Sequence, residues 1–364
     1  MTRAIDLARR GLGRTSPNPP VGAVIVRDGR VVGEGYHARA GLEHAEQVAL
    51  RMAGEKALGA TLYVTLEPCN HVGQTPPCTD AVIAAGLSEV HFAVRDPNEA
   101  VPGGGFHRLT EAGIRVFPDT GAEAAADVAR FWLHAVTSGR PYVIAKYAAS
   151  LDGKIASSAG TSRWITGEAA RTAAHAIRAE SDAILVGAGT AIADDPDLSV
   201  RLESFDGSQP WRVVLDSTGR VPLDRRLFRN GGNRTIVATT GRMPAAHRLA
   251  LEALGVSVLE LRNDADSRVS PDDLLEALRA RGVVALLVEG GSDVLGTFFD
   301  RSLVDEVAVF LAPIVLGGRQ TPSAVGGSGV PSLARAHRLT RATMEPLDDD
   351  WLVRGRVSHS NRGE

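Results

Sequence analysis

Short apolar runs of strand character alternate with segments of helical pattern along nearly the whole chain. This alternation restricts the fold more than any other feature of the sequence, because repeated strand–helix–strand units build mostly parallel sheets covered by helices. In the first part of the chain, the predicted strands are Val21–Val26, Val31–Glu34, Thr61–Leu66 and Val90–Val94, and the predicted helices are Glu43–Leu58, Thr79–Ala85 and Gly121–Thr137. The pattern therefore predicts an α/β protein.

A break at Gly139-Arg140-Pro141 separates this series from a second one. Glycine and proline end helices, and 364 residues exceed the usual length of one domain, roughly 100–200 residues. The second series has predicted strands at Tyr142–Ala149, Ala183–Val186, Arg212–Leu215, Thr235–Ala238, Val283–Val288 and Glu306–Leu311, and predicted helices at Glu168–Glu180, at Ser292–Leu303 and between Ser270-Pro271 and Gly282. We predict two domains, residues 1–141 and 142–364, with a surface loop at 323–332.

Charge is balanced in both parts of the chain, which weighs against a nucleic-acid partner. Residues 1–142 hold 14 basic and 15 acidic side chains, and residues 143–364 hold 26 and 28. A nucleic-acid enzyme usually shows a basic excess. No apolar run approaches the ~20 residues of a transmembrane helix, and Met1–Asn18 lacks the apolar segment of a secretory signal. We expect a cytoplasmic protein that acts on a small molecule and binds neither nucleic acid nor membrane.

The strongest chemical signal combines His44-Ala45-Glu46 with the two cysteines of the chain, Cys69 and Cys78, each preceded by a proline. A disulfide is disfavoured in a reducing cytoplasm, so metal ligation or buried packing thiols remain. One imidazole and two thiolates leave a fourth tetrahedral position for water, which is the pattern of a catalytic zinc site. A His-x-Glu triplet alone is common by chance, but the joint pattern favours one zinc ion per chain.

Glu46 stands two residues after the predicted ligand His44 and can therefore remain off the metal. Zinc lowers the pKa of bound water, and a nearby carboxylate can move protons between that water and a leaving amine. This combination is the signature of zinc-dependent base deaminases, in which the cysteines are two residues apart. Here eight residues separate Cys69 from Cys78. We predict Glu46 as the catalytic residue.

The segments around these residues resemble the deaminase domain of the bacterial bifunctional riboflavin-biosynthesis deaminase/reductase. The matching stretches are Pro17–Gly22, Gly33–His37, His44–Glu46 and Glu67–Cys78. The resemblance implies a three-layer domain similar to cytidine deaminases, and it implies that Asn18, His37 and His71 contact a pyrimidine nucleotide. Asn18 is also a good turn residue between prolines, and a single histidine is usually structural. The family usually has Lys or Arg where Gln74 stands, so phosphate binding must depend on other groups.

The resemblance continues into the second domain, where it implies an α/β fold similar to dihydrofolate reductase and the use of NADPH. The matching stretches are Arg140–Val143, Lys146–Lys154, Ser162–Thr166, Gly189-Thr190, Asp194–Pro196 and Val288–Gly291. The implied cofactor contacts are Ala148, Trp164, Thr190, Asp194, Ser217, Gly291, Ser292, Asp293, Val294, Leu295, Gly296 and Thr297. The implied substrate contacts are Ser162, Arg178, Leu198, Arg201 and Glu289. Lys154 is a further candidate, for the carbonyl or ribose of the substrate.

The residues themselves support a nucleotide site in this domain only weakly. Glu289-Gly290-Gly291 follows a predicted buried strand and precedes a helix, where backbone N–H groups can approach a pyrophosphate; a tight turn is the plainer alternative. No G-x-G-x-x-G follows a strand, so an ordinary Rossmann domain is disfavoured. Trp164 could equally belong to the core. Arg178 and Lys154 could equally be solvated, although two arginines, Arg178 and Arg201, suit a sugar phosphate.

The resemblance implies two successive steps of riboflavin biosynthesis. The first is zinc-dependent deamination of 2,5-diamino-6-(5-phosphoribosylamino)pyrimidin-4-one. The second is NADPH-dependent reduction of the ribosyl group to ribityl, giving 5-amino-6-(5-phosphoribitylamino)uracil. Two alternatives remain open: a nucleoside or nucleic-acid deaminase with an appended domain, and a second domain that only binds nucleotide or mediates assembly. The long segment between the cysteines and the even charge oppose the first alternative. We also expect a homo-oligomer.

Overall fold

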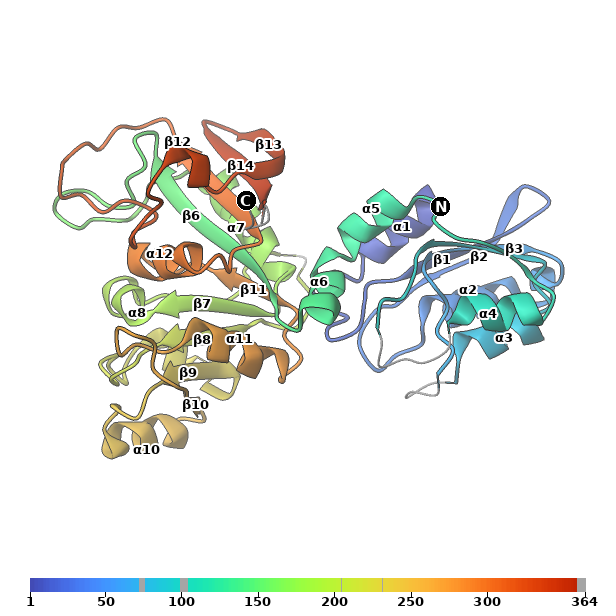
Figure 1. The fold of residues 1–364 in the computed structure, drawn as a ribbon, viewed down its shortest axis with the longest axis horizontal. Helices are drawn as coiled ribbons and strands as arrows, with labels where there is room; N and C mark the ends of the chain where they lie inside the picture. The colour runs from blue at the N-terminus through green and yellow to red at the C-terminus, as the bar shows by residue number, and fades with distance from the viewer. Residues whose placement is uncertain (72–75, 99–103, 204, 231, 359–364) are drawn as a thin grey trace. The chain divides into compact units, whose positions relative to one another are not determined.

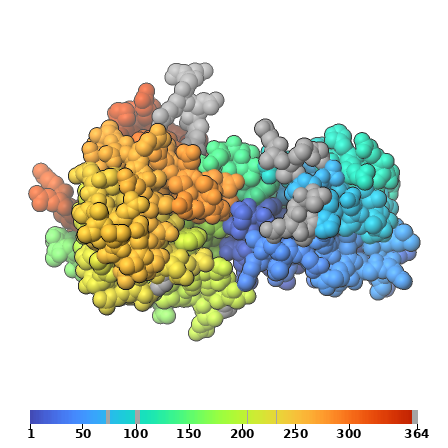
Figure 2. All heavy atoms as spheres, turned by 90° about the horizontal axis from the view of Figure 1, so that it is seen from below, coloured from blue at the N-terminus to red at the C-terminus, as the bar shows by residue number. Residues whose placement is uncertain are grey.

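Two separate sheets organise the chain, one in each of two units, Met1–Arg140 and Pro141–Glu364 (Figure 1). The computed structural model describes residues 1–71, 76–98, 104–203, 205–230 and 232–358. The space-filling view shows each unit built from one continuous stretch of chain, blue to green in the first and green to red in the second (Figure 2). None of the described helices combines the length and the apolar character that crossing a bilayer requires.

The first unit contains a sheet of five strands among the described residues, in the order β2-β1-β3-β4-β5. Its strands are β1 (Gly22–Arg27), β2 (Arg30–Tyr36), β3 (Thr61–Leu66), β4 (Glu89–Val94) and β5 (Arg115–Phe117). Its helices are α1 (Thr2–Arg9), α2 (Ala45–Ala53), α3 (Cys78–Ala84), α4 (Gly105–Glu111), α5 (Ala122–Val128) and α6 (Arg130–Ser138), with a 3₁₀ turn η1 (Gly54–Ala57). β1 pairs antiparallel with β2 and β3, whereas β3, β4 and β5 are parallel.

Helices cover both faces of this sheet, so the unit has the predicted three layers. α1 and α5 pack on one face, where Ile5, Ala8, Ala125 and Val128 are buried with Ala93. On the other face, α2, α3 and α4 bury the larger apolar cluster (Figure 1). Burial of apolar surface on both faces is what stabilises such an arrangement.

The second unit contains a sheet of nine strands among the described residues, in the order β10-β9-β8-β7-β11-β6-β12-β14-β13. Its strands are β6 (Tyr142–Ser150), β7 (Ala183–Gly187), β8 (Trp211–Leu215), β9 (Thr235–Thr239), β10 (Ser257–Glu260), β11 (Ala285–Val288), β12 (Glu306–Ala312), β13 (Leu339–Leu347) and β14 (Asp350–Val357). Its helices are α7 (Glu168–Ala179), α8 (Ala188–Asp194), α9 (Arg226–Arg229), α10 (Ala245–Ala253), α11 (Pro271–Arg279) and α12 (Ser292–Asp300), with 3₁₀ turns η2 (Gly232–Arg234) and η3 (Leu333–Arg335).

Neighbouring strands from β10 to β12 all pair in parallel, as the alternation predicts. β14 and β13 continue the sheet as an antiparallel hairpin. α11 and α12 pack on one face through buried residues such as Leu274, Leu278 and Phe298 (Figure 1). The N-terminus of α11 is capped as predicted, because the Ser270 hydroxyl accepts a hydrogen bond from the Asp273 amide at 3.3 Å.

Most predicted elements lie within a few residues of their observed bounds, and β3 matches residue for residue. The helix predicted over Gly121–Thr137 is two helices, α5 and α6, which meet at Ala129. The helix predicted over Glu43–Leu58 begins later, at Ala45, and ends as the 3₁₀ turn η1.

Candidate active sites

The side chains of His44, Cys69 and Cys78 meet in the first unit. His44 lies at the N-terminus of α2, Cys69 follows β3, and Cys78 is the first residue of α3. Their ligand atoms lie within 4.8 Å of one another, and His44 Nδ1 is 3.2 Å from Cys78 Sγ and 3.6 Å from Cys69 Sγ. Tetrahedral zinc with ordinary bond lengths separates nitrogen and sulfur ligands by roughly 3.5 Å. The three donors therefore fit a zinc ion.

Glu67 holds the segment that follows β3. Its buried carboxylate accepts hydrogen bonds from the amides of Phe106 at 2.8 Å and Asp96 at 3.3 Å. The Cys78 amide donates to Cys69 Sγ at 3.4 Å, and the Thr79 amide donates to the Cys69 carbonyl. These bonds fix Cys69 against the start of α3, so the long segment between the two cysteines does not separate their sulfur atoms.

The electrostatics of this cluster set Glu46 apart. Glu46 lies in the first turn of α2 and is 4 % exposed. Burial raises the pKa of its carboxyl to about 7, and the negative charge of Cys69 adds to the effect. The Cys78 thiol and His44 both donate to Cys69, and these bonds lower the pKa of Cys69 to about 4. The pKa of the Cys78 thiol is raised, because this thiol donates a hydrogen bond to Cys69 and is buried.

Two of the predicted pyrimidine contacts lie together beside the cluster. Asn18 Nδ2 is 3.3 Å from His37 Nε2, and His37 Nδ1 is 3.0 Å from the Glu43 carbonyl. Burial lowers the pKa of His37, so a neutral ring can donate through Nδ1 and accept from Asn18. The His37 and His44 ring centroids are 5.4 Å apart. The two residues thus form a connected group next to the predicted metal ligand.

His71 presents an unsatisfied polar atom. Its Nδ1 is buried and has no hydrogen-bond partner among the described residues, a state that costs free energy unless a ligand or water completes it. Gln74 lies outside the described residues, so the structure does not bear on its replacement of a basic residue.

A cavity of about 1130 Å³ lies in the second unit. It lies at the carboxyl ends of the parallel strands β6, β7, β8, β9 and β11, where open α/β sheets bind their ligands. Most of the predicted reductase contacts line it: Ala148, Ser162, Trp164, Arg178, Thr190, Asp194, Leu198, Arg201, Ser217, Glu289, Gly291, Ser292, Asp293, Val294, Leu295 and Thr297.

Two predicted contacts are not among the lining residues. Lys154 Nζ donates to the Thr321 carbonyl at 3.1 Å. Gly296 faces the 326–327 backbone instead, since a Cβ there would lie 2.4 Å from the carbonyl carbon of Gly326. Trp164 is 69 % exposed and is therefore not a core residue; the Arg171 guanidinium lies over its ring.

A buried carboxylate with two cations lies in the cavity wall. Arg178 Nε and Nη2 donate to the two oxygens of Glu289 at 2.6 and 2.8 Å, so Arg178 is not a solvated helix residue. Lys146 Nζ is 3.6 Å from Glu289 Oε2. Burial alone would raise the pKa of Glu289, but Arg178 and Lys146 outweigh it and hold that pKa well below its usual range. Glu289 is therefore ionised at neutral pH.

Lys146 and His175 are not among the site residues predicted from the sequence. Lys146 lines the cavity from β6. Its signal was present, because it is one of only three lysines in an arginine-rich chain. His175 lies on α7 and is 9 % exposed, and its Nδ1 accepts a hydrogen bond from the Arg201 amide at 3.1 Å. No motif marks His175, since its partner is a backbone group 26 positions away.

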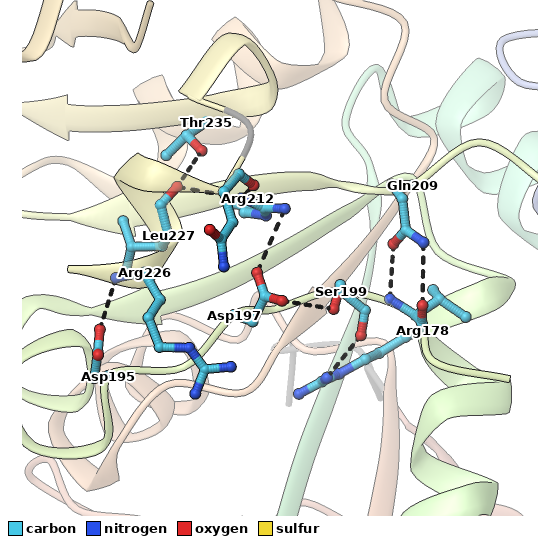
Figure 3. Close-up of polar contacts among 11 residues, drawn as sticks. Arg178, Asp195, Asp197, Ser199, Gln209, Arg212, Arg226, Leu227 and Thr235 are labelled. Carbon is cyan, nitrogen blue, oxygen red and sulfur yellow. Dashed lines mark hydrogen bonds and ion pairs between the residues drawn. The ribbon is translucent and has the colours of Figure 1, made fainter. Parts of the chain in front are cut away.

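Side chains from several elements hold the segment that follows α8 (Figure 3). Asp195 accepts from the Arg226 amide at 2.8 Å, and Asp197 lies 3.6 Å from the Arg212 guanidinium and accepts from the Ser199 hydroxyl. Leu198 has a positive φ of 54°, is 2 % exposed and lines the cavity. The segment is therefore fixed by its contacts rather than by helix or strand.

Glycines and small residues line the end of the cavity where the cofactor contacts are predicted. Gly291 precedes α12, and a Cβ on Gly291 would lie 3.1 Å from the Thr190 hydroxyl. Ser217 follows β8; its hydroxyl accepts from the Val269 amide and its carbonyl accepts from the Thr240 hydroxyl. Three exposed arginines, Arg220, Arg242 and Arg268, line the same end. At this end of the cavity, a ligand can come close to the backbone at Gly291, and the three arginines supply positive charge.

Family models match both units. The RibD C-terminal domain matches residues 141–353, and the cytidine and deoxycytidylate deaminase zinc-binding region matches residues 1–94. The riboflavin biosynthesis protein RibD of Bacillus amyloliquefaciens is 43 % identical over 350 residues, which are 96 % of this chain and 93 % of that protein.

Solved structures agree over nearly the whole chain. The RibD structure from Acinetobacter baumannii (form 2) has a TM-score of 0.88 at 40 % identity and covers 98 % of this chain and 97 % of its own. A diaminohydroxyphosphoribosylaminopyrimidine deaminase/5-amino-6-(5-phosphoribosylamino)uracil reductase from Thermotoga maritima has a TM-score of 0.85 at 37 % identity, with coverages of 98 % and 97 %. With both domains matched, the chain belongs to the RibD family of riboflavin biosynthesis proteins, bifunctional enzymes that join a deaminase to a reductase.

Proposed function

We propose that the first unit deaminates 2,5-diamino-6-(5-phosphoribosylamino)pyrimidin-4-one and that the second unit reduces the ribosyl group of the product to ribityl. One observation carries this proposal: the same chain holds a three-donor zinc cluster beside a buried carboxyl and, in a separate unit, a cavity lined by most of the predicted reductase contacts. The relatives that match over nearly the whole chain support it.

In the first unit, His44, Cys69 and Cys78 would hold the metal. Zinc bound there would supply a polarised water molecule as the nucleophile. Glu46 is buried beside these ligands and is the group placed to take a proton from water and pass it to the leaving nitrogen. Water then provides the ring oxygen and ammonia leaves. Asn18, His37 and His71 would bind the pyrimidine, and the unsatisfied Nδ1 of His71 supports this role.

In the second unit, NADPH bound in the cavity would supply the hydride that reduces C1′ of the ribosyl group, and a proton on the released ring oxygen would complete the ribityl chain. The protein's task is to place donor and acceptor against each other. Arg201 is exposed on the cavity wall, and its guanidinium makes no ion pair with any residue that the structure describes, whereas the Arg178 guanidinium is paired with Glu289. We therefore assign the substrate phosphate to Arg201, with Arg178 and Glu289 shaping the site around it.

The preferred cofactor in this proposal is NADPH rather than NADH. The 2′-phosphate of NADPH is commonly recognised by arginine, and Arg220, Arg242 and Arg268 line the end of the cavity that also contains Ser217. Asp264 lines this end as well, but its carboxylate accepts from the amides of Asp266 and Arg268. Equal kcat/KM values for NADPH and NADH would reject the preference.

The proposal includes a homo-oligomer in the cytoplasm, with no nucleic-acid partner. Every residue of β13 except Leu347 is exposed, including Leu339 and Met344, and an exposed apolar edge strand is often covered by a partner. Thiolate ligands also need a reducing compartment. Light scattering on the purified protein tests the oligomer, and a monomer at working concentration would reject it.

The decisive experiment separates and then recombines the two steps. Glu46→Gln should lower ammonia release at least a hundredfold yet still oxidise NADPH when the deaminated intermediate is supplied. Arg201→Ala should release ammonia normally but reduce the supplied intermediate with a kcat/KM lowered about 10–150-fold. A mixture of the two variants should complete both steps, because the intermediate can diffuse. Failure of the mixture, with each variant keeping its remaining activity, would mean transfer within one assembly. No NADPH oxidation by the unaltered protein would leave the second unit as a binding module.

A further inference from the structure

Four consecutive backbone polar groups are bound by side chains in a segment without helix or strand. This segment, residues 195–210 apart from Ser204, connects α8 to β8. The Ser199 carbonyl accepts from Arg178 Nη1 at 3.0 Å, and the Val200 amide and carbonyl both bind Gln209 (Figure 3). The Arg201 amide donates to His175. In most irregular segments the backbone amides and carbonyls bind water instead. Here side chains bind four of these backbone groups in a row.

Gln209 binds Val200 as a neighbouring strand would. Its Oε1 accepts from the Val200 amide at 2.7 Å, and its Nε2 donates to the Val200 carbonyl at 3.1 Å. Figure 3 shows the two bonds side by side. Val200 is 5 % exposed. Its backbone would therefore be left unsatisfied away from water if the Gln209 amide were removed.

His175 fixes the next residue from the opposite direction, out of α7. Its Nδ1 accepts from the Arg201 amide at 3.1 Å, which requires a neutral ring. Burial, followed by the charges of Arg178 and Arg201, lowers the pKa of His175 to about 4. The ring is therefore an acceptor at neutral pH, and the backbone immediately before the Arg201 side chain is held from two sides.

We propose that Gln209 and His175 are positioning residues of the reductase site, which fix the backbone at Val200 and Arg201 so that the Arg201 guanidinium is presented to the substrate phosphate. The inference rests on the proposed function of Arg201. Neither residue lines the cavity, so both act through Arg201 and not by contact. Pre-organisation of this kind strengthens binding, because a backbone that is already fixed loses less conformational entropy when the substrate binds.

The first test compares Gln209→Met with Gln320→Met. Methionine keeps the length of the side chain and removes both hydrogen bonds, and Gln320 is exposed and does not line the cavity. We expect Gln209→Met to raise KM for the phosphorylated substrate roughly tenfold, with kcat and the KM for NADPH nearly unchanged, because uniform binding is lost. Gln320→Met should match the unaltered protein. Gln209→Glu, which keeps the bond from the Val200 amide, should fall between them.

The second test asks whether the effect passes through Arg201. In an Arg201→Ala background, Gln209→Met should no longer change KM, since residues that act through one group are not additive. His175→Ala should raise KM in the same way as Gln209→Met. His175→Asn should restore it, because the asparagine Oδ1 can accept from the Arg201 amide.

The outcomes separate this inference from the function on which it rests. If Gln209→Met raises KM equally with and without Arg201, both residues are merely structural and the inference is wrong. If Arg201→Ala raises KM but neither Gln209→Met nor His175→Ala does, the proposed function stands and the positioning role is rejected. If Arg201→Ala itself leaves reduction unchanged, the assignment of the substrate phosphate to Arg201 is wrong and the positioning role fails with it, whereas NADPH oxidation by the unaltered protein still supports the reductase. Thermal unfolding of each variant, together with intact deamination, shows that the protein has folded.

Discussion

The two sites draw their residues from very different lengths of chain. The zinc cluster takes its donors from residues 44 to 78 and places them at the starts of two helices and the end of one strand. The reductase cavity is lined by residues from 146 to 322. A metal site needs three donors within one coordination sphere, whereas hydride transfer needs a surface that holds two large molecules against each other.

This difference determines how strongly a single substitution should reduce the activity of each site. In the first unit, a few side chains carry the chemistry, so one substitution can remove it completely. In the second, many backbone and side-chain groups share the binding, so single substitutions should change affinity by modest factors. The expected effects therefore fall from the metal ligands to the cavity and then to its supports.

The largest effect is expected from Cys69→Ser combined with Cys78→Ser. Two of the three donors are lost, so zinc content should fall from about one ion per chain to near zero and deamination should fall below detection. Metal analysis and ammonia release measure the two results, and NADPH oxidation with supplied intermediate is the internal control. Full deamination by the doubly substituted protein would contradict the assignment.

Glu46→Gln should follow, with a 10²–10⁴-fold loss of deamination, the usual contribution of general acid–base catalysis. The amide keeps the size of the side chain but cannot carry the proton, so zinc should stay bound. Glu55→Gln, at an exposed position in η1, is the matched control. A loss smaller than tenfold would assign proton transfer to another group.

Arg201→Ala tests the larger site. Loss of a charged hydrogen bond to the substrate phosphate, about 1.5–3 kcal/mol, corresponds to about 10–150-fold in reductase kcat/KM. Deamination should be nearly unchanged. Arg229→Ala, exposed and away from the cavity, provides the comparison. If a folded Arg201→Ala protein lost both activities, the division of labour between the two sites would be wrong.

A smaller change is expected from Arg220→Ala combined with Arg242→Ala. Removing positive charge near Ser217 should reduce the ratio of kcat/KM for NADPH to that for NADH, by roughly tenfold, since rim charges contribute modestly. The KM for the pyrimidine substrate should not move. An unchanged ratio would place 2′-phosphate recognition elsewhere in the cavity.

The last prediction concerns the pH dependence of stability rather than activity. The folded pKa of His175 is about 4, below its ordinary value of 6.5, so the unfolded chain binds more protons between these two values. The free energy of unfolding should therefore decrease as the pH falls from 6.5 to 4, by at most about 1.4 kcal/mol per pH unit from this one group. His175→Asn should show a shallower decrease in denaturant titrations. Identical slopes would contradict the buried neutral ring.

The same contrast governs what the sequence could predict. His44, Glu46, Cys69 and Cys78 could be predicted from the sequence because metal chemistry needs rare residue types in a recognisable order, and the structure brings the ligand atoms of the histidine and the two cysteines within 4.8 Å of one another. The parallel sheets were found because buried strands are continuous apolar runs. The β13–β14 hairpin was not predicted, since β13 is exposed along nearly its full length and carries no apolar period. α1 was considered only as a leader segment, although Ile5 and Leu7 are buried.

The residues that hold the backbone beside the cavity of the second unit could not be predicted from sequence patterns, for another reason. Gln209 and His175 bind backbone groups at Val200 and Arg201, and any residue type can supply a backbone group. Lys146 meets Glu289 across 143 positions of sequence. Only folding brings such pairs together, and no spacing rule encodes them.

The closeness of β2 to α2 gives the deaminase a steric dependence that no charged residue reveals. A Cβ on Gly35 would lie 2.6 Å from the Ala45 carbonyl oxygen, and one on Gly33 would lie 2.2 Å from the Ala49 carbonyl oxygen. Ala45 stands between His44 and Glu46. A single added methyl group on the strand would thus displace the first turn of the helix, and with it the predicted zinc ligand His44 and the proposed proton carrier Glu46. The reactive geometry depends on the absence of two side chains as much as on those present.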